Sequence, residues 1–117
     1  MTAPPLQILV VEDNQVLLRA LCEMLTVLGH RVHGVGSAEA ALEPLRSGQY
    51  KLLLADLHLP GMSGIDLARL AVDMVPGMRI IFASGFGYLL AERLEFDFEL
   101  LHKPYFFDQL KLALMPE

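Results

Sequence analysis

Five residues whose side chains could carry out chemistry stand at the ends of short apolar runs. They are Glu12, Asp13, Asp56, Ser84 and Lys103. Carboxylates about 4 Å apart repel one another by about 4 kcal/mol at an effective dielectric constant near 20, so such a group needs a compensating cation. Mg²⁺ takes one or two carboxylates with phosphate oxygens and water, lysine adds a positive charge, and serine adds a hydroxyl donor. Together these groups predict a site for phosphoryl transfer onto a carboxylate.

Bringing these residues together requires the apolar runs to be neighbouring strands. Residues 8–11, 52–55 and 80–83 are almost wholly apolar and rich in branched side chains. Continuous apolar strands, in place of alternating ones, are typical of a parallel sheet that is covered on both faces. Residues 31–35 are a weaker candidate for a second strand, and residues 98–102 are predicted to form the fifth.

The segments between these strands have helical patterns. Leucines and Met24 recur at helical spacing before Gly29, which suits a left-handed helix end. Ser37 and Ser63 can each cap a helix, and Pro44 is expected to kink the second helix or end it early. The predicted helices cover residues 14–28, 37–48, 63–74, 89–94 and 105–114.

The alternation of strands and helices predicts the fold class. It indicates an α/β protein with a doubly wound, five-stranded parallel sheet and helices on both faces, because each parallel return needs a crossover. A length of 117 residues fits one domain over residues 1–117. The binding crevice of such a sheet lies at the carboxyl ends of its strands, where all five polar residues fall.

Composition excludes several classes of protein. The net charge is −5 without any block of Lys or Arg, which argues against direct contact with nucleic acid. No apolar run approaches the roughly 18 residues of a membrane span, and the start lacks a signal-peptide pattern. The single cysteine, Cys22, suits a reducing cytosol, so we expect a soluble cytoplasmic protein.

His30, His33 and His102 lack metal-ligand spacing and are predicted to be surface or strand residues.

Four short motifs together resemble a known family. They are VVEDN at 10–14, DLHLPGMSG at 56–64, ASG at 83–85 and KP at 103–104. In this order they are similar to the receiver domains of two-component response regulators, the CheY-like family with a flavodoxin-like fold. The resemblance covers essentially the whole chain. It implies a signalling domain that catalyses only its own phosphorylation and dephosphorylation.

The resemblance also implies a metal site. In the family pattern Asp13 and Asp56 would bind Mg²⁺ directly and Glu12 would bind it through water. The backbone carbonyl of His58 would complete the protein ligands. Asp56 would then be the residue that accepts a phosphoryl group from a phosphohistidine of a histidine kinase or phosphotransfer protein.

The remaining motif residues would contact the phosphoryl group. Ser84 would turn inward to hold a phosphoryl oxygen, and Lys103 would bridge the phosphate and the acidic pocket. The family also implies a cis peptide bond before Pro104.

Two features depart from the family pattern. Leu100 stands three positions before the lysine, where an aromatic switch residue is common, so the resemblance does not extend to coupling through an aromatic flip. The stretch 84–103 is a few residues short, which predicts a truncated or loose helix near 89–94. This helix, the strand at 98–102 and the last helix at 105–114 would form the face for a downstream protein or a second copy.

An aromatic group lies in the same part of the chain: Phe96, Phe98, Tyr105, Phe106 and Phe107. We expect most of these five rings to pack in the hydrophobic core. Because a whole helical turn and alternating strand residues cannot all face inward, we expect one or two of these rings to be exposed and to mark a partner surface.

Two other functions compete with the phosphoacceptor. One is a protein-binding module that keeps the fold but is never phosphorylated. Leu100 and the short stretch 84–103 support this alternative. The other is a phosphatase with an aspartyl-phosphate intermediate that resembles the haloacid dehalogenase family. Those enzymes need a second acid two residues after the nucleophile, and His58 occupies that place. Whether the chain acts alone or within a longer regulator or hybrid kinase stays open.

Overall fold

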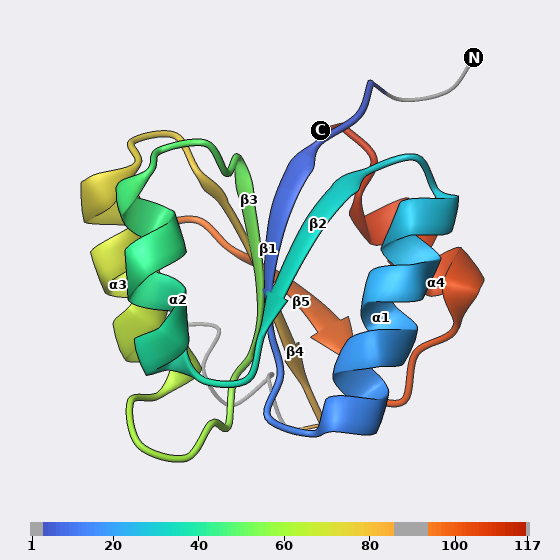
Figure 1. Ribbon diagram of the computed structural model, residues 1–117, viewed down its shortest axis with the longest axis horizontal. Helices are drawn as coiled ribbons and strands as arrows, with labels where there is room; N and C mark the ends of the chain where they lie inside the picture. The colour runs from blue at the N-terminus through green and yellow to red at the C-terminus, as the bar shows by residue number, and fades with distance from the viewer. Residues whose placement is uncertain (1–3, 86–93, 117) are drawn as a thin grey trace.

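A computed structural model describes residues 4–85 and 94–116 and contains one five-stranded sheet (Figure 1). All strand pairs are parallel, and the order across the sheet is β2-β1-β3-β4-β5. This confirms the predicted doubly wound α/β architecture. The strands are β1 (Gln7–Val11), β2 (Arg31–Val35), β3 (Leu52–Asp56), β4 (Arg79–Ser84) and β5 (Glu99–His102).

Four of the predicted helices lie within the described residues. They are α1 (Gln15–Val27), α2 (Ala38–Arg46), α3 (Gly64–Met74) and α4 (Phe107–Ala113). The helix predicted near 89–94 falls, except for its last residue, outside the described part of the chain. None of the described helices is long and apolar enough to cross a bilayer.

Side-chain caps explain where three helices begin. The Asn14 side chain accepts hydrogen bonds from the first turn of α1, and Ser37 and Ser63 do the same for α2 and α3. Helix α2 continues through Pro44 for two residues, so the proline lies in the last turn and does not end the helix. The last helix starts at Phe107, two residues later than predicted.

The sheet is buried between two helical layers, with α2 and α3 on one face and α1 and α4 on the other (Figure 1). Successive residues of β1 divide between the layers. Leu9 and Val11 pack on the α2 and α3 side, whereas Ile8 and Val10 pack on the α1 and α4 side. Burying each such side chain contributes about 1.5–3 kcal/mol. This two-sided burial explains why residues 8–11 of β1 and 52–55 of β3 are apolar without interruption.

His30 corrects one sequence-based expectation. It precedes β2 and is buried, so it is neither a surface nor a strand residue, whereas His33 and His102 are exposed strand residues as predicted. Its Nδ1 atom accepts a hydrogen bond from the backbone N–H of Leu6 at 3.0 Å. Accepting this bond requires an unprotonated Nδ1, and burial lowers the pKa of His30 below its ordinary value.

The buried neutral imidazole predicts a pH dependence of stability. A folded-state pKa below the unfolded value means that His30 stabilises the fold above the unfolded pKa, and that this contribution is lost as the pH falls through the folded pKa. Between about pH 7 and pH 5, where histidine titrates, the unfolding free energy of wild type should fall more than that of His30→Gln. Urea denaturation at each pH measures this, with His102→Gln as the control. Equal losses in wild type and His30→Gln would contradict it.

Candidate functional site

The carboxyl ends of β1 and β3 bring three acidic side chains together. Asp56 is the last residue of β3, and Glu12 and Asp13 directly follow the neighbouring strand β1. One carboxylate oxygen from each residue lies within 4.8 Å of the others. Glu12 and Asp56 are buried and Asp13 is exposed. The predicted gathering of these acids is therefore present, with one side open to solvent.

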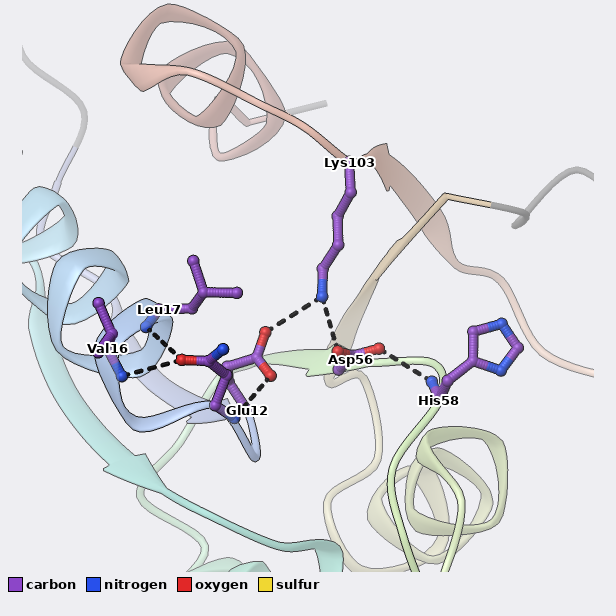
Figure 2. A network of polar contacts seen from close by, with 7 residues as sticks. Glu12, Val16, Leu17, Asp56, His58 and Lys103 are labelled. Carbon is purple, nitrogen blue, oxygen red and sulfur yellow. Dashed lines mark hydrogen bonds and ion pairs between the residues drawn. The ribbon is translucent and has the colours of Figure 1, made fainter.

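Lys103 reaches across the sheet edge to two of these acids. It follows β5, and its Nζ lies 2.7 Å from Asp56 Oδ2 and 3.1 Å from Glu12 Oε1 (Figure 2). Burial alone would lower the pKa of Lys103, but its hydrogen bonds and charge interactions with the two carboxylates outweigh burial and raise it. Lys103 therefore stays charged and balances the acids.

Each of the two buried carboxylates also accepts a backbone hydrogen bond from the residue two positions later. Glu12 Oε2 accepts from the N–H of Asn14 at 3.1 Å, and Asp56 Oδ1 accepts from the N–H of His58 at 2.9 Å. Burial raises the pKa of Glu12, and the bonds from Asn14 and Lys103 oppose this. Both oxygens of each carboxylate are thus held, and the imidazole of His58 points away from them (Figure 2).

Ser84 and Lys103 are connected through their backbones. Ser84 ends β4 and is buried, and its carbonyl accepts a hydrogen bond from the N–H of Lys103 at 3.1 Å. Asp56 is paired with Ala83, so Ser84 lies one residue beyond the phosphoacceptor candidate on the adjacent strand. The Lys103–Pro104 peptide bond is cis, as the family resemblance implied.

Gly64 is a part of the site that the sequence analysis missed. It begins α3, and a Cβ atom there would overlap the backbone carbonyl oxygen of Asp56. The sequence analysis placed Gly64 in a turn and at the end of the family motif at 56–64, but gave it no role. The close approach of a helix start to a strand end depends on tertiary packing, so no local signal distinguished this glycine from an ordinary turn residue.

The donor atoms fit a hard divalent cation. The cluster of Glu12, Asp13 and Asp56 offers carboxylate oxygens alone, and the exposed Asp13 leaves the cluster accessible. Oxygen ligands of this kind suit Mg²⁺, whereas soft metals prefer sulfur or imidazole. The side chains present therefore match the predicted ion.

The aromatic group divides between core and surface. Phe96 and Phe98 pack around Phe82, with ring centroids 6.5 Å and 5.6 Å from it. Phe106 is 71% exposed and Phe107 is 37% exposed. This confirms the expectation of one or two exposed rings. Leu100, at the aromatic position of the family, packs partly buried against the core on the α2 and α3 side.

Comparison with known proteins identifies one family. The family described as "Response regulator receiver domain" matches residues 8–114. The response regulator receiver protein CpdR of Brucella abortus is 36% identical over 81 residues, which cover 69% of this chain and 68% of CpdR. The response regulator protein FleR of Pseudomonas aeruginosa is 35% identical over 81 residues, and the chain spans only 17% of its length. The sensor protein ArcB of Escherichia coli is 38% identical over 69 residues, 59% of this chain and 9% of ArcB.

Solved structures agree with the sequence comparisons. A response regulator receiver protein from Sinorhizobium medicae has a TM-score of 0.85 at 28% identity, and the match covers 94% of this chain and 91% of that one. The response regulator PhyR from Brucella abortus has a TM-score of 0.84 at 27% identity, with coverage of 97% and 47%.

The contact at Gly64 predicts a cost for adding one methyl group. In Gly64→Ala the new Cβ must push the start of α3 away from the Asp56 backbone, which should lower the unfolding free energy by about 1–3 kcal/mol. Urea denaturation measures the change. Gly85→Ala is the matched control, because a Cβ there meets no atom of residues 4–85 and 94–116 within 4 Å. A Gly64→Ala protein as stable as Gly85→Ala would show that the two backbones are not in contact.

Proposed function

Because the chain belongs to the response regulator receiver domain family, we propose that Asp56 accepts a phosphoryl group in a Mg²⁺-dependent reaction and that the modified domain signals by a change in conformation. The observation that carries this proposal is the placement of the Asp56 carboxylate. It lies 2.7 Å from Lys103 Nζ within a group of three acids that could hold a metal ion. Residues 1–117 would act as one receiver domain.

Asp56 has the properties of a positioned nucleophile. Its side chain is mostly buried, and hydrogen bonds from Lys103 and the His58 backbone hold its two oxygens. In the proposed step one of these oxygens attacks phosphorus, the P–N bond of a donor phosphohistidine breaks, and the histidine nitrogen keeps the electron pair and takes up a proton. Most of the rate would come from orientation and charge neutralisation.

The acidic cluster supplies the metal ligands in this proposal. Asp13 and Asp56 would bind Mg²⁺ directly, Glu12 would bind through water, and the carbonyl of His58 would be the fourth protein contact. Bound Mg²⁺ neutralises negative charge and orients phosphoryl oxygens. Lys103 would move from the carboxylates toward a phosphoryl oxygen, and the Ser84 hydroxyl would donate to another.

The partners follow from the proposed donor chemistry. A histidine kinase or phosphotransfer protein in the cytoplasm would supply the phosphoryl group, and the domain would catalyse only its own phosphorylation and dephosphorylation. Matching segments also occur in proteins named as sensors, such as ArcB of Escherichia coli and BvgS of Bordetella pertussis. The exposed Phe106 and Phe107 would belong to the surface that meets a downstream protein or a second copy.

One observation favours a second function, a binding module that is never phosphorylated. Leu100 lacks an aromatic ring, so movement of Ser84 cannot be coupled to a ring flip at that position. The gathered acids and the lysine favour the phosphoacceptor instead. Carboxylates held so close together repel one another, and a protein that serves only as a binding module has no use for an arrangement with that energetic cost.

Phosphorylation predicts a defined change in mass. Incubation with Mg²⁺ and acetyl phosphate should add one phosphoryl group to wild type, with acetate as the leaving group. The Asp56→Asn protein, and wild type with excess chelator, should gain none. Asp66→Asn, which alters an exposed acid of α3, is the matched control and should gain one. Intact-protein mass spectrometry reads the result. A wild type that stays unmodified while an established receiver reacts under the same conditions would favour the binding module.

A further inference from the structure

The loop between β3 and α3, residues 57–63, carries backbone groups of the proposed site. It is fixed near both ends. The N–H of Leu57 donates to the carbonyl of Ala83 at 3.1 Å, and Ser63 caps α3 through the N–H of Asp66 at 3.1 Å. Between these points Leu59 is buried, but Pro60 and Gly61 are exposed. The outer part of the loop therefore needs a further contact to keep one conformation.

Glu39, in the first turn of α2, supplies that contact from another element. Its Oε2 atom accepts a hydrogen bond from the N–H of Met62 at 3.2 Å, across a separation of 23 residues. A Cβ atom at Gly61 would lie 2.5 Å from the same oxygen. The carboxylate thus lies against the backbone of two consecutive loop residues. Gly61 also has φ of 74°, in the left-handed region that favours glycine.

The contact is specific to Glu39 among the exposed acids of α2. Glu43, one turn later, pairs with Arg46 of its own helix at 2.8 Å. Within the described residues no ion pair involves Glu39, and the bond that its side chain makes is to the loop backbone. A charged acceptor on an amide gives a stronger hydrogen bond than a neutral one.

We propose that Glu39 is a positioning residue, which holds the 57–63 loop so that the His58 backbone keeps its place beside Asp56 and the proposed metal ligands. This inference rests on the proposed function. Pro60 has a fixed φ, so the short chain between Met62 and His58 has fewer torsions that could absorb a movement of the loop. Releasing Met62 therefore increases the spread of positions of the His58 carbonyl.

Two measurements on four proteins test the inference. Amide hydrogen exchange by NMR reports on the N–H of Met62, and calorimetric titration with Mg²⁺ gives the dissociation constant. Glu39→Ala should speed exchange at Met62 and raise the Mg²⁺ dissociation constant about three- to tenfold, the range for loss of one hydrogen bond. Glu39→Gln keeps a neutral acceptor oxygen and should lie between wild type and Glu39→Ala in both measurements. Glu43→Ala is the matched control and should equal wild type in both measurements.

The possible results distinguish failure of the Glu39 proposal from failure of the proposed phosphoacceptor function. If wild type binds Mg²⁺ and is phosphorylated, but Glu39→Ala binds Mg²⁺ as tightly as Glu43→Ala, then Glu39 does not position the loop and the proposed function stands. Equal weakening in Glu39→Ala and Glu39→Gln would also overturn the inference, because charge and not the hydrogen bond would then be responsible. A wild type that binds no Mg²⁺ would remove both proposals.

Discussion

The ammonium group of Lys103 lies between the carboxylates of Glu12 and Asp56, and the arrangement of the site depends on this contact. Two acids at neighbouring strand ends repel strongly where solvent is partly excluded, and one positive charge from a third strand offsets that repulsion. The hydrogen bonds of Lys103 also depend on the charge at Asp56. Any group that brings charge to Asp56, whether a metal ion or a phosphoryl group, changes which oxygens the lysine can reach.

The fold fixes the positions of these charged side chains. Apolar strands buried on both faces fix the strand ends, so the acids cannot move apart to relieve their repulsion. Backbone amides of Asn14 and His58 hold the remaining oxygens, and each amide begins the segment that leads to the next helix. These two bonds connect the acids to the start of α1 and to the loop before α3, the loop that Glu39 contacts from α2.

The strands, the helix starts and most of the candidate site could be predicted from the sequence, because each depends on residues that are near one another in the chain. Continuous apolar runs specified the strands, serines and Asn14 marked helix starts, and polar residues directly after the strands identified the acids and Lys103. The features that it missed depend on contacts between distant segments. Gly64 meets the Asp56 backbone, His30 accepts a bond from Leu6, and Glu39 contacts the loop at Met62. Glu39 looks like an ordinary first-turn acid, and only the packing of α2 beside the loop gives it another partner.

In the proposed function, Asp56 at the end of β3 shares one divalent cation with Glu12 and Asp13, which follow β1. Titration with Mg²⁺, followed through the backbone amide resonances of Asp13, Asp56 and His58, measures this binding. A shared cation should give saturable shifts at these amides with a single dissociation constant, and the shifts should be lost in Asp13→Asn without loss of the fold. Shifts that do not saturate, or that persist unchanged in Asp13→Asn, would contradict a shared metal site.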